Sequence, residues 1–446
     1  MKLWKKDYNL DKAVEAFTVG NDYLLDQKLV VYDCFGSIAQ AKMLAKIKVL
    51  SGEEEKKLVE SLKSIIKLSE EGKFKILQED EDCHTAIENH LIKETGEAGK
   101  KIHAGRSRND QVLTALRLYT KAELLHVMSL VTELVKSLQK FAEKNRDVPM
   151  PGYTHMQKAM PSSVGLWGAS FAESLEDDFE ALKTAYNINN QSPLGSAAGF
   201  GSILDTDRKF TADLLGFKSV QNNVLYVQNS RGKTEVMVLD ALSYIMSTIN
   251  KLATDLLLFT MQEFQYFSLP KTFLTGSSIM PQKYNYDVLE LLRAKSNLVA
   301  AKGIELRMIT GSLPSGYNRD FQLIKLAFFE SFDTTIESVA ILTEVIKCLQ
   351  VNKDKLVAAC TPELFMTDAA LKLVKGGMPF REAYQQVTGK PVTKIDTVKA
   401  IKSRSGIGMP GNLNLDKEKV HKFEQLINSE ESSWNSVKMN LMDWHG

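Results

Sequence analysis

A polar loop containing two small hydroxyls is the segment of this chain best suited to chemistry. Residues 276–285 read Gly-Ser-Ser-Ile-Met-Pro-Gln-Lys-Tyr-Asn. Ser277 becomes a base only if its alkoxide is stabilised, and Lys283 together with nearby backbone N–H groups could supply that stabilisation. Lys283 could also hold a carboxylate while a proton leaves the neighbouring carbon, because the carbanion's charge spreads onto the carboxylate oxygens. The loop, with Asn285 at its end, predicts proton removal beside a carboxylate.

A second polar segment, residues 151–157, supplies a group that can take or give a proton near neutral pH. Its histidine, His155, can act as acid or base because unperturbed imidazole titrates close to neutrality. Thr154 beside it could hold a carboxylate. Glu290, which follows the first loop, could orient a histidine as carboxylates do in proton-relay pairs. The alternative is a hydrogen-bonded histidine in a turn, which the residues alone do not exclude.

A third segment, residues 102–111, crowds Arg, Ser, Asn and Gln into a turn ahead of a long periodic stretch. Backbone N–H groups at a helix start, together with Arg106 and Arg108, could bind an anion. The alternative is an ordinary capped helix start, with Asn109 or Asp110 as the N-cap. The residues alone favour neither reading over the other.

A fourth segment, residues 317–322, is followed closely by Lys325. Gln322 and Lys325 are three positions apart, so in a helix they would share one face and could contact one ligand. The alternative is a solvated helix start, which such polar runs usually are. This segment therefore indicates a binding site only if the fold brings it close to the three other polar segments.

The length of 446 residues favours two or three domains. Apolar residues make up 44% and charged residues 25%, as in an average globular protein, so a large core is expected. The formal net charge of +1 gives no support for binding nucleic acid or a membrane surface. Any anion binding must therefore come from local arrangement of side chains and not from the overall charge.

Motifs for metals, nucleotides and membranes are missing from the sequence. Its four cysteines (Cys34, Cys83, Cys348 and Cys360) show no metal or redox spacing, which predicts small buried thiols. There is no nucleotide-binding loop, EF-hand loop or His-x-x-x-His pair. The N-terminus lacks an apolar signal region, and the longest apolar run, residues 256–261, is far too short to span a bilayer. These features predict a cytoplasmic protein.

The spacing of proline predicts the elements that must position these segments. Proline breaks helix interiors, and it is absent before Pro149, which leaves room for long helices. Apolar residues recur every three or four positions in several stretches, whereas alternating strand patterns are nearly absent. We therefore predict an all-α fold, with long helices over residues 112–145, 161–186, 233–264, 287–310 and 320–349.

Three parts are expected along the chain. They are an N-terminal helical part (1–110), a central bundle of long helices (111–354) that carries the loop 275–290, and a small C-terminal part with shorter helices (355–446). Helices far longer than the usual ~11 residues present long apolar stripes. One copy cannot cover such stripes, so we expect a homo-oligomer with a shared helical core.

The chain resembles the fumarase/aspartase superfamily and, within it, the argininosuccinate lyases. The resemblance runs in order from about Trp4 to Tyr384. The loop 276–285 is similar to the superfamily's signature loop, and residues 105–111 (Gly-Arg-Ser-Arg-Asn-Asp-Gln) match the run that marks argininosuccinate lyases. Further matching segments are 82–88, 152–157, 317–322 and 379–384.

This resemblance implies a fumarase/aspartase-like fold and reversible cleavage of argininosuccinate into L-arginine and fumarate, as in arginine biosynthesis. The family needs no metal and no organic cofactor, and it works through a carbanion held as an aci-carboxylate. By carry-over, Ser277 and His155 are the proton-transfer pair and Glu290 is the partner of His155. Which of the pair abstracts the proton stays open. Lys283 joins this catalytic set and, with Asn285, would hold the carboxylate that becomes the aci form.

The resemblance also implies substrate-binding residues and an assembly. Ser107, Arg108, Asn109 and Thr154 would bind the succinate part, and Tyr317, Gln322 and Lys325 the arginine part or its carboxylate. The family usually has a substrate-binding serine near residues 20–22, where this chain has Gly-Asn-Asp, and Asp22 is our choice for that contact. The family is a homotetramer whose active sites draw residues from three subunits.

Two alternatives remain at this point. Another fumarate-releasing lyase of the superfamily, such as an adenylosuccinate lyase or an aspartase, would keep the signature loop, but residues 105–111 argue against it. A non-catalytic relative, like the lens δ-crystallins, would keep the fold and lose the chemistry. The presence of His155, Ser277, Lys283 and Glu290 disfavours that second alternative.

Overall fold

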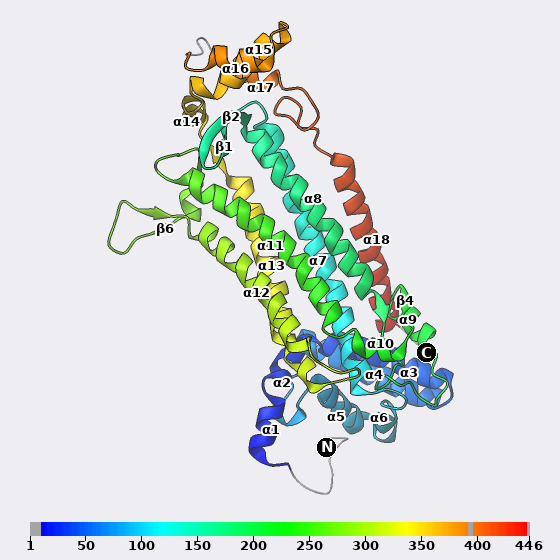
Figure 1. Cartoon of the computed structure of the whole chain (residues 1–446). Coiled ribbons are helices and arrows are strands. Elements are labelled where there is room, and N and C mark those ends of the chain that lie inside the picture. The colour runs from blue at the N-terminus through cyan, green and yellow to red at the C-terminus, as the bar shows by residue number, and fades with distance from the viewer. Residues whose placement is uncertain (1–9, 391–395, 444–446) are drawn as a thin grey trace.

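Five long helices running side by side form the body of the molecule, as the computed structural model shows for residues 10–390 and 396–443 (Figure 1). The N-terminal helices gather at one end of this bundle and the short C-terminal helices at the other. The five are α7 (Arg108–Lys144), α8 (Val164–Asn189), α11 (Lys233–Thr260), α12 (Asp287–Thr310) and α13 (Ile324–Cys348). The predicted all-α fold is confirmed, with only a few short strands between the described helices.

Local sequence explains where the longest helix, α7, begins. Ser107 is its N-cap, and the Ser107 hydroxyl oxygen accepts a hydrogen bond from the Asn109 N–H at 3.2 Å. Asp110 completes a capping box by accepting from the Ser107 N–H at 2.9 Å. The expectation that Asn109 or Asp110 would be the N-cap is therefore wrong, because the box needs the hydroxyl residue first and the carboxylate three positions later.

The predicted helix boundaries hold best where no turn interrupts the pattern. The helix predicted over 287–310 is α12, with the same limits. The helix predicted from 161 begins only at Val164, because residues 161–163 belong to a hairpin. In that hairpin β1 (Pro149–Thr154) pairs antiparallel with β2 (Gln157–Ser163), and residues 155–156 form the turn between them.

Most of the N-terminal part is helical, as expected, and it packs across one end of the bundle. Trp4, where the family resemblance begins, lies outside the described residues. The elements are α1 (Lys12–Val19), α2 (Asp22–Leu25), η1 (Asp26–Lys28), α3 (Val30–Lys46), α4 (Gly52–Glu70), η2 (Gln78–Asp80), α5 (Cys83–Thr95) and α6 (Glu97–Lys101).

Short elements connect the long helices and turn the chain at their ends. Three further strand pairs are only two residues long on each side: β3 (Gln191–Ser192) with β4 (Ser219–Val220), β5 (Phe267–Ser268) with β8 (Gln350–Val351), and β6 (Thr275–Gly276) with β7 (Tyr284–Asn285). The remaining connectors are α9 (Arg208–Leu214), α10 (Val224–Asn229), η3 (Lys271–Phe273) and η4 (Arg319–Gln322).

One helix near the C-terminus departs from the expectation of short helices after residue 354. The first elements of this part are short, but α18 extends over 26 residues and runs back along the bundle (Figure 1). The ring of Phe423 on α18 stacks on that of Phe179 of α8, with centroids 3.7 Å apart. The part comprises α14 (Lys353–Ala359), η5 (Pro362–Phe365), α15 (Met366–Lys375), α16 (Phe380–Val387), α17 (Thr397–Lys402) and α18 (Lys417–Met442).

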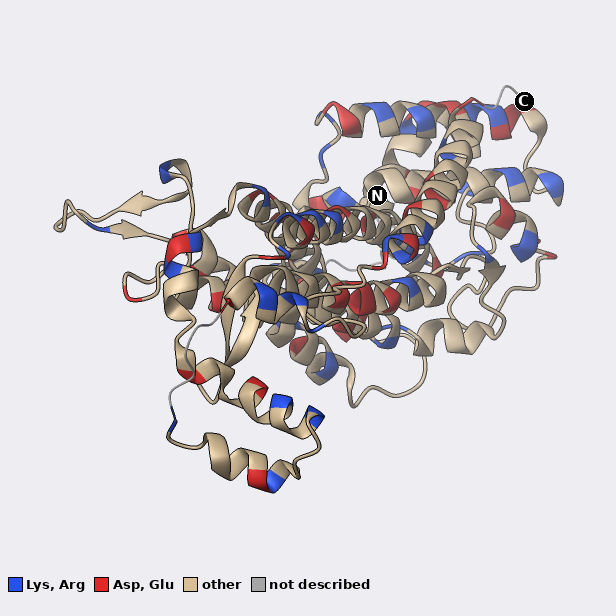
Figure 2. Ribbon diagram, turned by 90° about the horizontal axis from the view of Figure 1, so that it is seen from above, with Lys and Arg blue, Asp and Glu red and all other residues tan. Residues whose placement is uncertain are grey.

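Charged side chains of both signs are spread over the helices, and one helix of the bundle is markedly apolar. Lys and Arg alternate with Asp and Glu over most helices (Figure 2), as the near-zero net charge suggests. Among the described helices, α11 alone is long and apolar enough to cross a membrane by length and composition, and 56% of its apolar window is buried inside the chain. Such burial is what a core helix shows as well, so this feature carries no membrane argument.

Candidate active site

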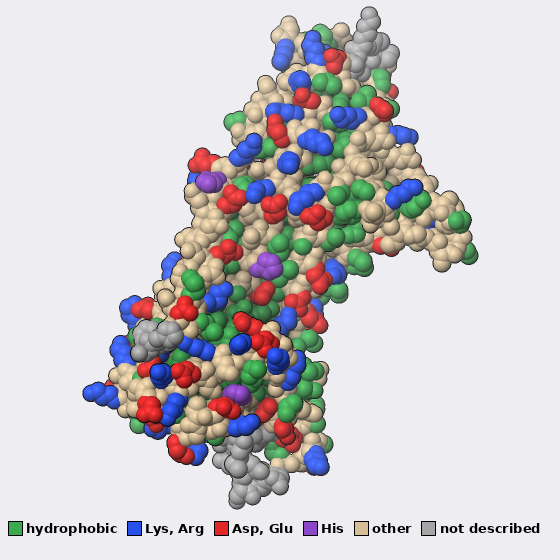
Figure 3. Space-filling view, turned by 180° about the vertical axis from the view of Figure 1, so that it is seen from behind, with side chains coloured by type: hydrophobic (Ala, Val, Ile, Leu, Met, Phe, Trp, Pro, Cys, Tyr) green, Lys and Arg blue, Asp and Glu red, His purple; other side chains and the backbone are tan. Residues whose placement is uncertain are grey.

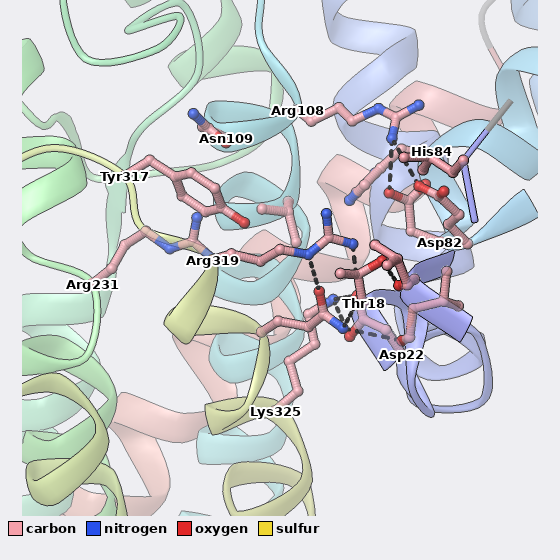
Figure 4. Close-up of a pocket in the computed structure, with 16 residues that line it drawn as sticks. Thr18, Asp22, Asp82, His84, Arg108, Asn109, Arg231, Tyr317, Arg319 and Lys325 are labelled. Atoms are coloured by element: carbon pink, nitrogen blue, oxygen red, sulfur yellow. Dashed lines mark hydrogen bonds and ion pairs between the residues drawn. The ribbon is translucent and has the colours of Figure 1, made fainter. Parts of the chain in front are cut away.

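A cavity of about 410 Å³ opens where the N-terminal helices meet the ends of the bundle (Figure 4). Residues from five stretches of sequence line it, including α1, the start of α5 and the start of α7. Of the residues predicted to bind substrate, six line this cavity: Asp22, Arg108, Asn109, Tyr317, Gln322 and Lys325. Ser107 lies directly beside them as the N-cap of α7.

Buried ion pairs hold Lys325 at the edge of this cavity. The Nζ atom of Lys325 lies 2.6 Å from Oδ1 of Asp26 and 3.0 Å from Oδ2 of Asp22. Burial alone would lower the pKa of Lys325, but the two carboxylates outweigh it and raise that pKa. Burial raises the pKa of Asp22 to about 6, against the opposing effect of Lys325 and with a further increase from Asp26. Asp22 therefore gains or loses its negative charge near pH 6, while Lys325 stays cationic.

Gln322 and Arg319 fasten α1 over the cavity. The Gln322 Nε2 donates to the carbonyl oxygens of Thr18 and Val19, both at 3.0 Å. Arg319 Nη2 donates to the same Thr18 carbonyl at 2.9 Å. These carbonyls belong to the last turn of α1, where a helix leaves acceptors without intrahelical partners. Gln322 lies in the 3₁₀ turn η4 and Lys325 in the first turn of α13, so the two do not share one α-helix. Both side chains nevertheless line the cavity.

Carboxylates and a histidine stand on the side of the cavity opposite Tyr317 (Figure 4). Arg108 Nη1 lies 3.3 Å from Oδ2 of Asp82, and Asp82 also caps α5 by accepting from the Thr85 N–H at 2.8 Å. His84 contacts the buried carboxylate of Asp33 through Nδ1. Burial alone would lower the pKa of His84, but the charge of Asp33 raises it above its usual value. The cavity thus combines fixed cations with fixed anions.

The predicted acid–base residue His155 lies far from this cavity, in the exposed turn of the β1–β2 hairpin. His155 has φ 51°, a left-handed backbone conformation that is uncommon for a non-glycine residue. Thr154 precedes it and is exposed as well. Tyr153 anchors the strand, because its hydroxyl hydrogen-bonds the Tyr266 hydroxyl at 2.8 Å. The hairpin therefore presents Thr154 and His155 outward on a rigid base.

The loop that carries Ser277 projects from the bundle between β6 and β7 (Figure 1). The Ser277 Oγ accepts hydrogen bonds from the N–H groups of Ile279 at 3.4 Å and Met280 at 3.2 Å. Such N–H groups are the kind of stabilisation that a serine alkoxide needs. Asn285 closes the loop by donating from Nδ2 to the Gly276 carbonyl at 3.3 Å, and Lys283 is exposed at the loop surface.

Helix lengths show that one chain separates the predicted groups. Asn109 stands at the start of α7, and the hairpin of His155 follows its end, 37 residues or roughly 55 Å away at 1.5 Å per residue. Helix α12 is 24 residues or about 36 Å long, with Glu290 in its first turn and Tyr317 beyond its last. In the part of the chain that the structure describes, no hydrogen bond or ion pair joins His155 to Ser277 or Glu290. The cavity, the hairpin and the loop are three separate groups.

One cluster of potential metal ligands adjoins the cavity. Donor atoms of Asp26, Cys83 and His84 all lie within 4.8 Å of one another. Metal ligands must be deprotonated, however, and burial raises the pKa of the Cys83 thiol well above its usual value. Asp26 is already paired with Lys325, and His84 with Asp33. The cluster is therefore better explained as a hydrogen-bonded part of the cavity wall than as a cation site.

Several cavity residues had not been predicted as site residues. The largest omissions are Asp82, His84, Arg231 and Arg319, which line the cavity, and Asp26, which holds Lys325. The polar pair at 82 and 84 before a helical pattern is a recognisable sequence signal. The sequence signal at Arg231 was weak, because it is a single cation before Gly232. Nothing in the neighbouring residues distinguished it from a surface arginine.

Comparisons with known proteins agree with this architecture. A family model described as "Lyase" matches residues 6–300. Argininosuccinate lyase of Thermotoga neapolitana is 46% identical over 389 residues, covering 87% of this chain and 98% of that protein. Argininosuccinate lyase of Sorangium cellulosum is 41% identical over 418 residues, covering 93% of this chain and 97% of that protein.

Solved structures support the fold at lower identity. A crystal structure of EDDS lyase in complex with formate superposes with a TM-score of 0.82 at 22% identity, covering 98% of this chain and 95% of that one. A class II fumarase from Schistosoma mansoni gives 0.71 at 18% identity, covering 84% and 91%. These two matches concern the fold alone, whereas the sequence matches identify the family. The chain belongs to the argininosuccinate lyases, a family of lyase enzymes within the fumarase/aspartase superfamily.

Proposed function

We propose that this protein reversibly cleaves argininosuccinate into L-arginine and fumarate, the reaction that its relatives' name denotes. The observation that carries the proposal is convergence in space. Six residues predicted to bind substrate come from segments as far apart as Asp22 and Lys325, yet they line one cavity. That cavity offers cations for carboxylates and anions for an ammonium or guanidinium group, which argininosuccinate contains. Arginine biosynthesis and a cytoplasmic location follow as expectations.

The proposed chemistry is a β-elimination that uses side chains only. Ser277 or His155 takes the proton from the carbon beside a succinate carboxylate, and the electron pair moves into that carboxylate as the aci form. Lys283 and Asn285 stabilise this dianion because its charge lies on the carboxylate oxygens. The electron pair then forms the double bond of fumarate as the carbon–nitrogen bond breaks, and the leaving guanidino nitrogen takes a proton from the other member of the Ser277–His155 pair. Glu290 would orient His155 for its part in the transfer.

We propose further that a homotetramer assembles each site from different subunits, because the three groups are too far apart within one chain. Exposed apolar side chains support this assembly. Several stand along α12, a helix of the body, which is unusual for a helix that faces only water: Leu291, Leu298, Ile304 and Met308. Figure 3 shows apolar side chains gathered along the length of one face of the molecule. Light scattering should give a tetramer, and a fully active monomer would contradict this proposal.

The direct test of the activity is fumarate release, followed by the absorbance of fumarate. Purified protein should release fumarate from argininosuccinate, and much less from adenylosuccinate or aspartate supplied at equal concentration. Robust turnover of adenylosuccinate without turnover of argininosuccinate would instead indicate another lyase of the superfamily. No turnover of any succinyl adduct by folded protein would favour a non-catalytic, crystallin-like relative.

A further inference from the structure

One cation on the cavity wall, Arg231, has two guanidinium nitrogens without a hydrogen-bond partner among the described residues. Its side chain lines the cavity and is only 5% exposed. Among the described residues, none accepts a hydrogen bond from its Nε or Nη1. No carboxylate of the described chain forms an ion pair with it either. A buried charge without a partner is costly, by several kcal/mol per ion in real proteins, so the position invites a ligand.

The surroundings of Arg231 hold its guanidinium in place. The rings of Tyr317 and Phe321 each lie 5.0 Å, from ring centroid to guanidinium carbon, in cation–π contact. The backbone directly after Arg231 is equally constrained. Gly232 has φ 78°, and a Cβ at that position would lie 2.5 Å from Cγ2 of Thr310. These contacts favour a guanidinium held beside Tyr317 and Phe321 at the cavity wall.

The other cations of the cavity differ from Arg231 because each already has an acceptor. Lys325 is paired with Asp22 and Asp26, and Arg108 with Asp82. Arg319 donates to the Thr18 carbonyl. An incoming anion would compete with these acceptors, although Nη2 of Arg108 is also buried without an acceptor among the described residues. At Arg231 it would not, so Arg231 is the cation best prepared to bind one.

We infer that Arg231 binds the α-carboxylate of the arginine part of the substrate, opposite Asp22, which receives the α-ammonium. Arg231 and Tyr317 lie on one side of the cavity, and Asp22 lies across from them (Figure 4). A cation and an anion on facing walls complement an α-amino-acid head group, which carries both charges. The inference rests on the proposed function, because the succinate carboxylates are taken by the Ser107–Asn109 segment and by the loop of Lys283. Arg231 and Asp22 together would make the site specific for a leaving group that is an α-amino acid.

The test compares binding of L-arginine with binding of agmatine, which has the same guanidinium and chain but no α-carboxylate. We expect the wild-type protein to bind arginine at least roughly 30-fold more tightly than agmatine, as for loss of a charge-assisted bidentate contact. Arg231→Gln should lose most of that preference by weakening arginine alone, and Arg231→Lys should regain part of it. A merely structural role would weaken both ligands equally.

The matched control is Arg319→Gln, which removes a cation from the same cavity that already has a protein acceptor. It should leave the ratio of arginine to agmatine affinity within about threefold of wild type. Equal affinity of the wild-type protein for the two ligands would overturn the inference without any variant. Fumarate release from argininosuccinate with an unchanged ratio in Arg231→Gln would overturn the inference and leave the proposed function standing. A protein that neither cleaves argininosuccinate nor binds arginine would overturn both.

Discussion

Asn109 lies in the first turn of α7 and His155 lies beyond its last turn, so one chain cannot bring both to the same substrate. The helix is 37 residues long, or roughly 55 Å, and argininosuccinate is far shorter. The same separation holds for Glu290 and Tyr317 across α12. Each of these two helices thus separates a residue proposed to bind substrate at one end from a residue proposed to take part in proton transfer at the other. The predictions below follow from this arrangement and from the buried charges of the cavity.

Ser277→Ala and His155→Asn should each lower kcat by at least ~10²-fold, because each removes a group that transfers a proton. Both residues are on surface turns, so neither change should alter folding. The measurement is fumarate release, with circular dichroism and light scattering to verify fold and assembly. A variant of either residue with near-normal kcat would remove that residue from the mechanism.

Mixing the two inactive variants should restore activity if sites are shared between subunits. After joint unfolding and refolding at equal amounts, about one quarter of the sites in random tetramers would receive an intact His155 and an intact Ser277 from different subunits. Activity near that fraction of wild type is the expected result. The control is each variant refolded alone. Activity no greater than that of the controls would mean that one chain supplies both residues.

Affinity for L-arginine should fall as pH drops below about 6. Burial, opposed by Lys325 and reinforced by Asp26, raises the pKa of Asp22 to about 6, so Asp22 is ionised above that pH and neutral below it. A neutral Asp22 no longer attracts the α-ammonium of arginine, which should cost about tenfold in affinity at pH 5 relative to pH 7. Calorimetric titration at both pH values measures this effect. Asp22→Asn should bind weakly at both, and an unchanged pH dependence in that variant would assign the titration to another group.

The same shift has a consequence for stability with a definite sign. Because the pKa of Asp22 is higher in the folded protein than the ordinary value near 3.8, folding favours the protonated form. Its contribution to stability is therefore complete below about pH 4 and is lost as pH rises through about 6. Asp22→Asn should remove this contribution, so the difference in urea midpoint between variant and wild type should change between pH 4 and pH 7.

Lys325→Met should destabilise the fold by about 3–5 kcal/mol, because it leaves the buried carboxylate of Asp26 without its cation. Urea unfolding at fixed protein concentration measures the change. Lys347→Met is a matched control, since Lys347 pairs with Glu344 on an exposed helix face and its loss should change stability far less. Adding Asp26→Asn to Lys325→Met should recover part of the loss. Equal effects of the two lysine changes would show that the buried pair is not a structural requirement.

Sequence alone determined most of the long helices and the family of this protein. Helix limits depend on local signals, so the absence of proline and the apolar period were sufficient to predict α12 at 287–310. Residue types in short segments identified the loop of Ser277 and the histidine at 155 as proton-transfer candidates. The exact cap of α7 was not determined, because Ser107, Asn109 and Asp110 stand close together and all three cap helices.

Tertiary structure decided which of these groups meet. Asp22 and Lys325 are 303 positions apart, and no local pattern predicts that they form an ion pair. Arg231 looks like any surface arginine until Tyr317 and Phe321 enclose it beside the cavity. The separation of Asn109 from His155 likewise depends on α7 remaining straight through the bundle. Periodicity is a property of neighbouring residues, whereas burial, pairing and separation depend on how helices pack, and that packing involves residues from the whole chain.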